Sequence, residues 1–398
     1  MIDQQKVKAL AQAFAAETID IRRHIHANPE LSYEEFETAK YVTSRLQEWG
    51  IAYKEGVAGT GVVGLIYGKN PEKCTVALRG DMDALPITET NEVSYKSKNE
   101  GIMHACGHDV HTACLLGAAR ILQELRHSFE GTVKLVFQPG EEKNPGGASL
   151  MIKEGVLENP NPQAMFGQHV MPFIPTGKVG FREGKYMASA DEIYLTVKGK
   201  GGHAALPERS VDPIVIAAQI ITAMQQVVSR SADPKTPTVL TFGTIHGGHA
   251  QNIIPDEVKL SGTFRALDEE WRFKAHELIT NIAQGIATGL GGSCDVHIDV
   301  GYPYLCNDEA TTQLARRAAE DYLGEENVVD LDLWLGAEDF AYYSHQVPSC
   351  FYRLGTGNED KGTTKGVHTP NFNIDEDAIE VGIGLMAWIA LNRLNTNG

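Results

Sequence analysis

A chain of 398 residues is long for a single hydrophobic core, so its length predicts two domains. Its formal net charge of −17 disfavours nucleic acids and anionic membranes as partners, because both bind clustered Lys and Arg. The 42% hydrophobic and 22% charged residues are typical of a soluble globular protein, and no stretch is apolar enough to span a bilayer.

The amino-terminal residues 1–26 are predicted to form an amphipathic helix. Charged side chains occur throughout this segment, and it lacks the uninterrupted apolar core of a secretion signal. The six cysteines are scattered and show no spacing typical of a disulfide framework. We therefore expect a cytoplasmic protein.

Four short runs rich in β-branched and apolar residues are predicted strands, at 74–80, 131–139, 163–170 and 350–357. Each leads into a loop with polar side chains. Helical spacing of apolar residues, as in 109–126, separates them. Strands alternating with helices predict an α/β fold with a mostly parallel sheet covered by helices. In such sheets the ligand site lies beyond the carboxyl ends of the strands.

The region 189–302 has a different pattern. Its order of elements, βαββαβ, is that of a ferredoxin-like module. The strands are expected at 191–200, 236–248, 256–267 and 294–302, and the helices at 211–230 and 268–290. We therefore predict an inserted domain, 189–302, within a discontinuous larger domain formed by 1–188 and 303–398.

The stretch "GIMHACGHDVHTACLL", residues 101–116, is locally rich in Cys and His. Gly107 and a candidate N-cap, Asp109, predict a helix that begins just after His108. Cys106 and His108 would then lie in a loop at the amino terminus of this helix.

This stretch alone allows several explanations. His104 and His108 have the spacing of a zinc-binding HExxH motif, but Ala105 replaces the required glutamate and excludes that motif. A catalytic cysteine remains open, because a helix amino terminus and a nearby His stabilise a thiolate at Cys106. A buried Cys beside capping polar groups is equally compatible with the pattern.

Three further positions carry comparable chemistry. Adjacent Glu141 and Glu142 follow an apolar strand. Because adjacent side chains need not point the same way, one carboxylate could bind a metal while the other accepts and donates protons. His169 ends an apolar run, and His368 precedes a loop that contains proline. Each has an ordinary structural explanation when taken alone: an acidic turn, a strand-end His and an exposed loop His.

Together these positions predict a metal centre. Its expected ligands come from four separate strand-end loops, and they are Cys106, His108, Glu142, His169 and His368. Five mixed ligands exceed what one tetrahedral zinc accepts, which favours two ions with a shared bridge. Thiolate and imidazole favour Zn²⁺, and carboxylate admits Mn²⁺ or Co²⁺.

The motifs also resemble a known family, in order and over essentially the whole chain. The family is the aminoacylase, hippurate hydrolase and indole-acetyl-amino-acid hydrolase group of dinuclear metalloamidases, which belong with the carboxypeptidase and aminoacylase exopeptidases. The matching segments are "RRHIHANPELSYEEFETA", "LRGDMDALPI", "HACGHDVHTACLLGAA", "QPGEEKNPGGASLMI", "GQHVMP", "GKGGHAALPE", "AQNIIPDEVKLSGTFRALDEE", "GAEDFAYY" and "GVHTPNFNIDEDA".

The resemblance implies that the five expected ligands hold two divalent ions per subunit, Zn or Mn, with Co or Ni as alternatives. It implies that Glu141 is the general base. The inserted domain would close over the site and make a homodimer or dimer-based oligomer. His203 would then polarise the scissile carbonyl in a neighbouring subunit, and Asn252 and Arg265 would hold the substrate carboxylate, which suits a guanidinium.

One departure concerns the segment Asp81-Met82-Asp83, where distant relatives use a His-x-Asp motif. We expect Asp83 to support a ligand rather than to bind metal itself. His104 and His111 are likewise expected to support the ligands or cap the helix.

The expected function is metal-dependent hydrolysis of N-acyl amino acids to a carboxylic acid and a free amino acid. A dipeptidase, a carboxypeptidase or a diaminopimelate-type deacetylase would use the same chemistry. A non-catalytic small-molecule binding protein is disfavoured, because a binder needs no base such as Glu141. A cysteine-nucleophile hydrolase is disfavoured because Cys106 lies among the expected metal ligands.

Overall fold

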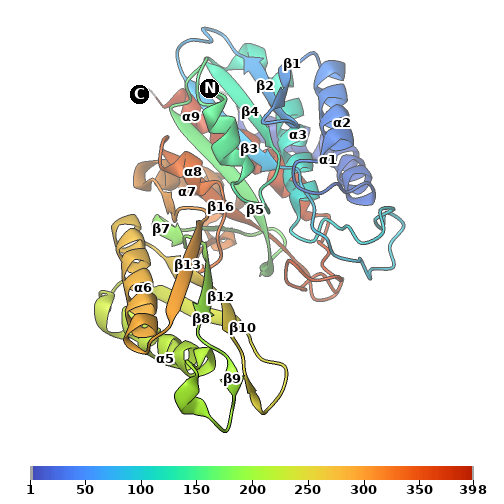
Figure 1. Ribbon diagram of the computed structural model, residues 1–398. Helices are drawn as coiled ribbons and strands as arrows, with labels where there is room; N and C mark the ends of the chain where they lie inside the picture. Colours follow the sequence, from blue (N-terminus) through green and yellow to red (C-terminus); the bar gives the residue numbers. More distant parts are fainter. Residues whose placement is uncertain (1–2, 397–398) are drawn as a thin grey trace. The chain divides into compact units, whose positions relative to one another are not determined.

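The computed structural model describes residues 3–396, which form two compact units (Figure 1). The first unit consists of residues 3–184, 306–332 and 339–396, and the second of Lys185–Leu305 and Leu333–Glu338. The predicted inserted range lies within the second unit. Leu333–Glu338 also belongs there, because the backbone N–H of Trp334 donates to the carbonyl of Tyr186, at 3.0 Å.

The first unit contains most of the helices and a large sheet. Its helices are α1 (Gln4–Ala27), α2 (Phe36–Glu48), α3 (His108–Glu124), α4 (Gly147–Lys153), α7 (Glu309–Leu323), α8 (Ala341–Ser344) and α9 (Ala378–Asn395). Its strands are β1 (Ala52–Val57), β2 (Gly61–Tyr67), β3 (Thr75–Asp81), β4 (Thr132–Gln138), β5 (Ala164–Pro175), β6 (Val179–Phe181), β15 (Val328–Asp330) and β16 (Ser349–Gly357). Two short strands, β7 (Gly184–Met187) and β14 (Leu305–Asn307), span the boundaries of the units.

The large sheet has the strand order β1-β2-β4-β3-β5-β16-β6-β15. Its central strands, β4, β3, β5 and β16, are parallel to their neighbours within that group. Antiparallel pairs occur toward both ends, between β1 and β2, β2 and β4, and β16 and β6. The predicted α/β class with a mostly parallel sheet is confirmed.

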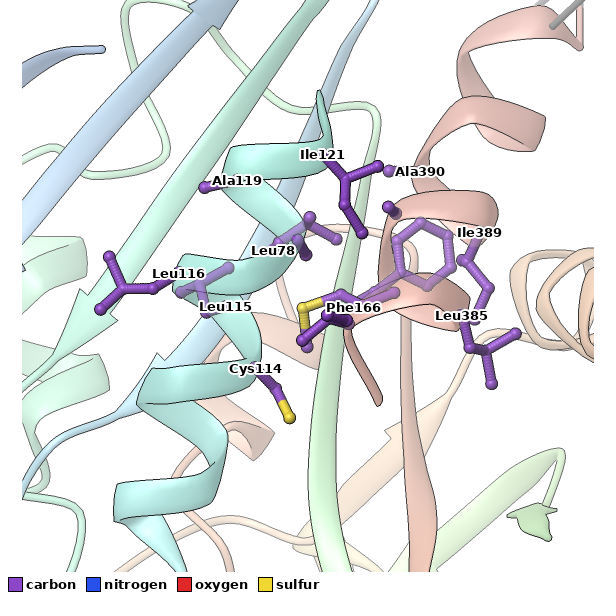
Figure 2. Packing of buried hydrophobic residues seen from close by; sticks show 14 of the residues in the cluster. Leu78, Cys114, Leu115, Leu116, Ala119, Ile121, Phe166, Leu385, Ile389 and Ala390 are labelled. Atoms are coloured by element: carbon purple, nitrogen blue, oxygen red, sulfur yellow. The ribbon is translucent and has the colours of Figure 1, made fainter. Parts of the chain in front are cut away.

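Helices α3 and α9 pack beside each other and contribute to the core of the first unit (Figure 2). Leu115 of α3, Leu385 of α9 and Phe166 of β5 are almost completely buried there. Gly117 permits this packing, because a Cβ at that position would lie 2.5 Å from Cγ2 of Ile383. The close approach holds α3 firmly, and α3 carries the Cys/His-rich stretch at its amino terminus.

The second unit contains a four-stranded antiparallel sheet of order β10-β12-β8-β13. Its elements are β8 (Asp191–Lys198), β9 (Gly202–His203), α5 (Pro213–Gln226), β10 (Thr238–His246), β11 (Ile253–Ile254), β12 (Glu257–Ala266), α6 (Glu269–Gly289) and β13 (Ser293–Val300). This order is the ferredoxin-like arrangement that the sequence predicts.

Alternating burial explains how the second unit folds. Ile193, Leu195 and Val197 of β8 point into one apolar cluster with the buried residues of α5, while the intervening side chains are more exposed. Pro213 occupies the first turn of α5, where its missing N–H costs little, and Asp212 caps the helix. Within residues 3–396, no helix has the length and apolarity to cross a membrane.

A buried ion pair anchors the helix α6 to the strand β8. The Asp191 carboxylate accepts hydrogen bonds from Arg272, through Nε at 2.9 Å and Nη2 at 2.5 Å, and lies 2.8 Å from His276 Nε2. Burial alone would raise the pKa of Asp191, but the hydrogen bonds from Arg272 and His276 lower it below its usual value. Because the folded-state pKa is depressed, this carboxylate stabilises the unit above its unfolded pKa and loses that effect as the pH falls through the folded pKa.

Replacing Asp191 with Asn should destabilise the second unit by about 3–5 kcal/mol, because the buried Arg272 guanidinium would lose its buried counter-charge and retain only the partly exposed Glu269. Urea unfolding, monitored by hydrogen exchange of the backbone amides in β8 and α6, measures the loss of stability. The control is Asp295→Asn, which removes an ion pair with Lys198 whose side chains are 68% and 50% exposed, and should cost only ~0–1 kcal/mol. Equal losses in the two variants would contradict the assignment.

Candidate metal centre

The glutamate pair lies in the loop between β4 and α4. The backbone N–H groups of Glu141 and Glu142 donate to the two carboxylate oxygens of Asp83, at 3.0 and 2.9 Å. Glu141 is 6% exposed, and its Oε1 accepts from the N–H of Asp339 at 3.3 Å. The loop is thus fixed by a buried carboxylate that follows the neighbouring strand β3.

Cys106 lies in the loop before α3, as the sequence predicts, whereas His108 is the first residue of the helix rather than part of the loop. Gly107 adopts a left-handed conformation with φ of 86°, and α3 begins at His108. The predicted N-cap role of Asp109 is wrong. Its side chain lies in the first turn and instead contacts Nε of Arg22, at 2.7 Å, and Nδ1 of His26, at 2.8 Å.

His169 lies within β5 rather than in a strand-end loop, which corrects the predicted location. The strand β5 continues to Pro175 because it pairs with β16, whereas its pairing with β3 ends at Gly167. His169 therefore lies beyond the part of β5 that pairs with β3, while still within the sheet.

His368 belongs to the loop between β16 and α9. Its φ of 62° is left-handed, a conformation that non-glycine residues seldom adopt. The N–H of His368 donates to the carbonyl of Ala105 at 2.7 Å, which fixes the loop beside the Cys106 segment.

The five expected ligands lie close together in the first unit. Sγ of Cys106 is 3.5 Å from Nε2 of His169 and 3.3 Å from Nε2 of His368. Oε1 of Glu142 is 3.1 Å from Nε2 of His368 and 3.9 Å from Nε2 of His108. Two ligand groups result: Cys106 with His108 and His169, and Cys106 with Glu142 and His368. Cys106 is common to both.

One buried polar atom at this cluster indicates a ligand. Among residues 3–396, no hydrogen-bond partner reaches Nε2 of His108, although the atom is buried. Such atoms are rare in folded proteins unless an ion or water satisfies them. His108 directs Nδ1 toward the carbonyl of Asp83 at 2.9 Å, and His169 directs Nδ1 toward the carbonyl of Val170 at 2.8 Å. Each imidazole thus presents Nε2 to the cluster, so the residues fit a divalent metal.

The electrostatics of His169 agree with this arrangement. Burial and the nearby Arg353 lower the pKa of His169 well below its usual value, so the imidazole is neutral, the form that binds metal. Burial raises the pKa of the Cys106 thiol. A divalent cation reverses that effect, because a coordinating thiol is deprotonated outright.

His104 and His111 lie beside the cluster. His111 uses both ring nitrogens: Nδ1 contacts the carboxylate of Asp81 at 2.6 Å, and Nε2 accepts from the N–H of Val170 at 2.9 Å. His104 is fully buried, and burial lowers its pKa to about 4. Neither imidazole belongs to the two ligand groups that share Cys106.

His203, Asn252 and Arg265 lie in the second unit. His203 is on β9 and exposed. The N–H of the next residue, Ala204, donates to the carbonyl of Asn252 at 3.1 Å, which brings His203 and Asn252 close together. Arg265 is on β12, and its Nε donates to Oγ1 of Thr263 at 3.1 Å. In the described part of the chain, no carboxylate lies within ion-pair distance of Arg265.

The site combines a buried thiol, three imidazoles and a pair of carboxylates at one edge of an α/β sheet. Such a combination of metal ligands and a candidate base is typical of a metal-binding hydrolase. The profile of peptidase family M20/M25/M40 matches residues 77–392, and the chain belongs to this family. It is therefore an enzyme, a hydrolase, and the predicted family resemblance is confirmed.

Individual relatives support this assignment. The chain is 42% identical to thermostable carboxypeptidase 2 of Saccharolobus solfataricus, over 95% of each chain. It is 43% identical to N-acetyl-L-cysteine deacetylase of Bacillus subtilis, over 91% of this chain and 84% of that one. A crystal structure from Bacillus subtilis, described as a dinuclear metal binding peptidase from the M20 family, matches with a TM-score of 0.83 and 35% identity, over 97% and 99% of the two chains.

Replacing Asp83 with Asn should weaken metal binding by about 10–100-fold, because the variant loses the charged acceptor that orients His108 and the glutamate loop. Calorimetric titration of the metal-free protein with Zn²⁺ or Mn²⁺ measures this change. The control is Asp330→Asn, whose side chain is 85% exposed and pairs with Arg316 on the surface. Unchanged affinity in the Asp83 variant would show that His108 is oriented without it.

Proposed function

We propose that this chain is a metal-dependent amidohydrolase that cleaves N-acyl amino acids to a carboxylic acid and a free amino acid. One observation carries the proposal: the buried carboxylate of Glu141 adjoins the five expected ligands, with Oε2 4.0 Å from Nε2 of His108. We call these five residues, Cys106, His108, Glu142, His169 and His368, the metal-type cluster. Glu142, the chain neighbour of Glu141, thus belongs to the cluster itself. The similarity to a deacetylase that acts on an N-acetyl amino acid supports the same substrate class.

The proposed cofactor is a pair of divalent ions, Zn or Mn, with Co or Ni as alternatives. Cys106, His108 and His169 would hold one ion, and Cys106, Glu142 and His368 the other. When bound, such ions lower the pKa of water and polarise a carbonyl oxygen.

The protein residues divide the remaining work. Glu141 would accept the proton of the attacking water and pass it to the leaving amine. Asn252 and Arg265 would hold the substrate carboxylate, and burial lowers the pKa of Arg265, whose charge a bound carboxylate would balance. His203 from a second copy of the chain would donate to the carbonyl oxygen as negative charge develops there.

This scheme assigns roles to the domains. Residues 1–188 and 303–398 would form the catalytic domain, and 189–302 a lid that also makes a homodimer or dimer-based oligomer. We propose that the protein acts on small molecules in the cytoplasm.

A carboxypeptidase is the second candidate, because a relative of that name is 42% identical. It would use the same residues on a peptide amide. A panel of N-acetyl amino acids, N-benzoyl amino acids and dipeptides separates the two, and faster turnover of the dipeptides would favour the peptidase. A binding protein without catalysis would turn over no member of the panel.

Replacing Glu141 with Gln should reduce kcat by about 10²–10⁴-fold, because the variant lacks the base, while the metal content stays at the wild-type level. The matched variant Glu142→Gln should instead lose metal along with activity. Elemental analysis and turnover of an N-acetyl amino acid distinguish these outcomes. Wild-type turnover in Glu141→Gln would exclude Glu141 as the base.

Chelation should abolish turnover and also lower the thermal stability of the first unit, since the ligands join segments that are far apart in the sequence. A site saturated at 100 times its Kd stabilises the fold by about 2.7 kcal/mol. Add-back of Zn²⁺, Mn²⁺, Co²⁺ or Ni²⁺ should restore both properties. Full activity in the presence of chelator would revive the cysteine-nucleophile hypothesis.

A further inference from the structure

Tyr33 and Glu35, which come before the cluster residues in the sequence, both contact the backbone of the glutamate loop. The buried carboxylate of Glu35 accepts a hydrogen bond from the N–H of Gly140 at 2.8 Å. The hydroxyl of Tyr33 donates to the carbonyl of Lys143 at 2.8 Å. These contacts lie immediately before Glu141 and immediately after Glu142.

The contacts of Glu35 form a closed local network. The same oxygen that accepts from Gly140 also accepts from the N–H of Tyr33 at 2.9 Å, and the other oxygen accepts from Oγ1 of Thr60 at 2.5 Å. Burial, reinforced by the negative charge of Asp83, raises the pKa of Glu35 to about 7. A buried carboxyl group at this position costs free energy, and the network provides the hydrogen bonds that offset the cost.

The Tyr33 ring also packs directly against the loop backbone. A Cβ at Gly140 would lie 2.3 Å from Cε1 of Tyr33, so only glycine allows this approach. Tyr33 itself has a φ of 68°, which is uncommon for an aromatic residue and unfavourable in isolation. The surrounding hydrogen bonds therefore maintain Tyr33 in a conformation that it would not adopt alone.

We propose that Tyr33 and Glu35 are positioning residues that brace Gly140–Lys143 and thereby hold Glu141 where it can exchange protons with substrate. This inference rests on the proposed function of Glu141. The brace is separate from the contacts of Asp83, which hold the N–H groups of Glu141 and Glu142. The two sets together fix four consecutive residues.

A general base must lie within about 2.6–3.2 Å of the atom that carries the proton it removes, so small displacements of this loop lower kcat before they alter substrate binding. Neither Tyr33 nor Glu35 belongs to the metal-ligand groups. Loss of the brace should therefore lower kcat while KM and the metal content change little.

The test compares Tyr33→Phe, Glu35→Ala and Glu35→Gln with the control Tyr67→Phe, whose side chain is 49% exposed on β2. Tyr33→Phe retains the ring and loses one hydrogen bond, which should lower kcat by about three- to tenfold. Glu35→Ala should lower kcat further, whereas Glu35→Gln should restore most of it, because the amide oxygen can still accept from Gly140. KM, metal content and Tm should change little in Tyr33→Phe.

Hydrogen exchange gives a readout that does not depend on activity. A peptide covering residues 139–147 should exchange faster in Tyr33→Phe and Glu35→Ala than in wild type or Tyr67→Phe. Wild-type kcat together with wild-type exchange in both variants would overturn the proposal, as would equal losses in Glu35→Gln and Glu35→Ala. If the wild-type enzyme hydrolyses no N-acyl amino acid, or if Glu141→Gln is fully active, the proposed function fails, and the exchange measurement still decides whether the brace exists.

Discussion

The buried carboxylate of Asp83 is the group on which the metal-type cluster depends. It is 1% exposed, and it receives the hydroxyl of Ser32 at 2.6 Å, the imidazole of His108 and two backbone N–H groups. A buried charge without such partners costs several kcal/mol. These donors come from three segments that are distant in the sequence. The hydrogen bonds to Asp83 therefore hold the start of α3 beside the glutamate loop.

Two other aspartates near the cluster follow the same principle. Asp81 is paired with Arg79 and His111, and Asp109 with Arg22 and His26, all almost fully buried. Burial opposes ionisation of Asp109, but Arg22 and His26 hold its pKa well below the usual range. In each case a buried arginine balances the charge of the carboxylate, so the pairs fix the segments around the cluster without leaving a buried charge unpaired.

The sequence predicted those features that local pattern determines. Alternating burial in β8 and the Asp212-Pro213 start of α5 are properties of a few adjacent residues. The predicted N-cap at Asp109 failed because Arg22, 87 residues away, provides a stronger partner than the helix backbone. His169 was misplaced for a related reason, since only pairing with β16, nearly 200 residues later, shows that β5 continues past it.

The candidate ligands could be nominated from sequence because thiol, imidazole and carboxylate chemistry is visible in residue type. Tyr33 and Glu35 could not, because their significance lies in single contacts to Gly140 and Lys143 across more than 100 residues. In the sequence they are part of an ordinary polar segment, "NPELSYEEF". What distinguishes these positions is visible only in the structure: the backbone φ is positive at Tyr33, as it is at His368.

The strain at His368 links two of the proposed ligands. A left-handed φ persists only where the surroundings enforce it, and here the N–H of His368 is bound to the carbonyl of Ala105, next to Cys106. The segment that offers the shared thiol therefore also fixes the backbone of the most distant ligand in the sequence. Displacing either segment would move both ligands together, so that the cluster responds to its environment as one unit.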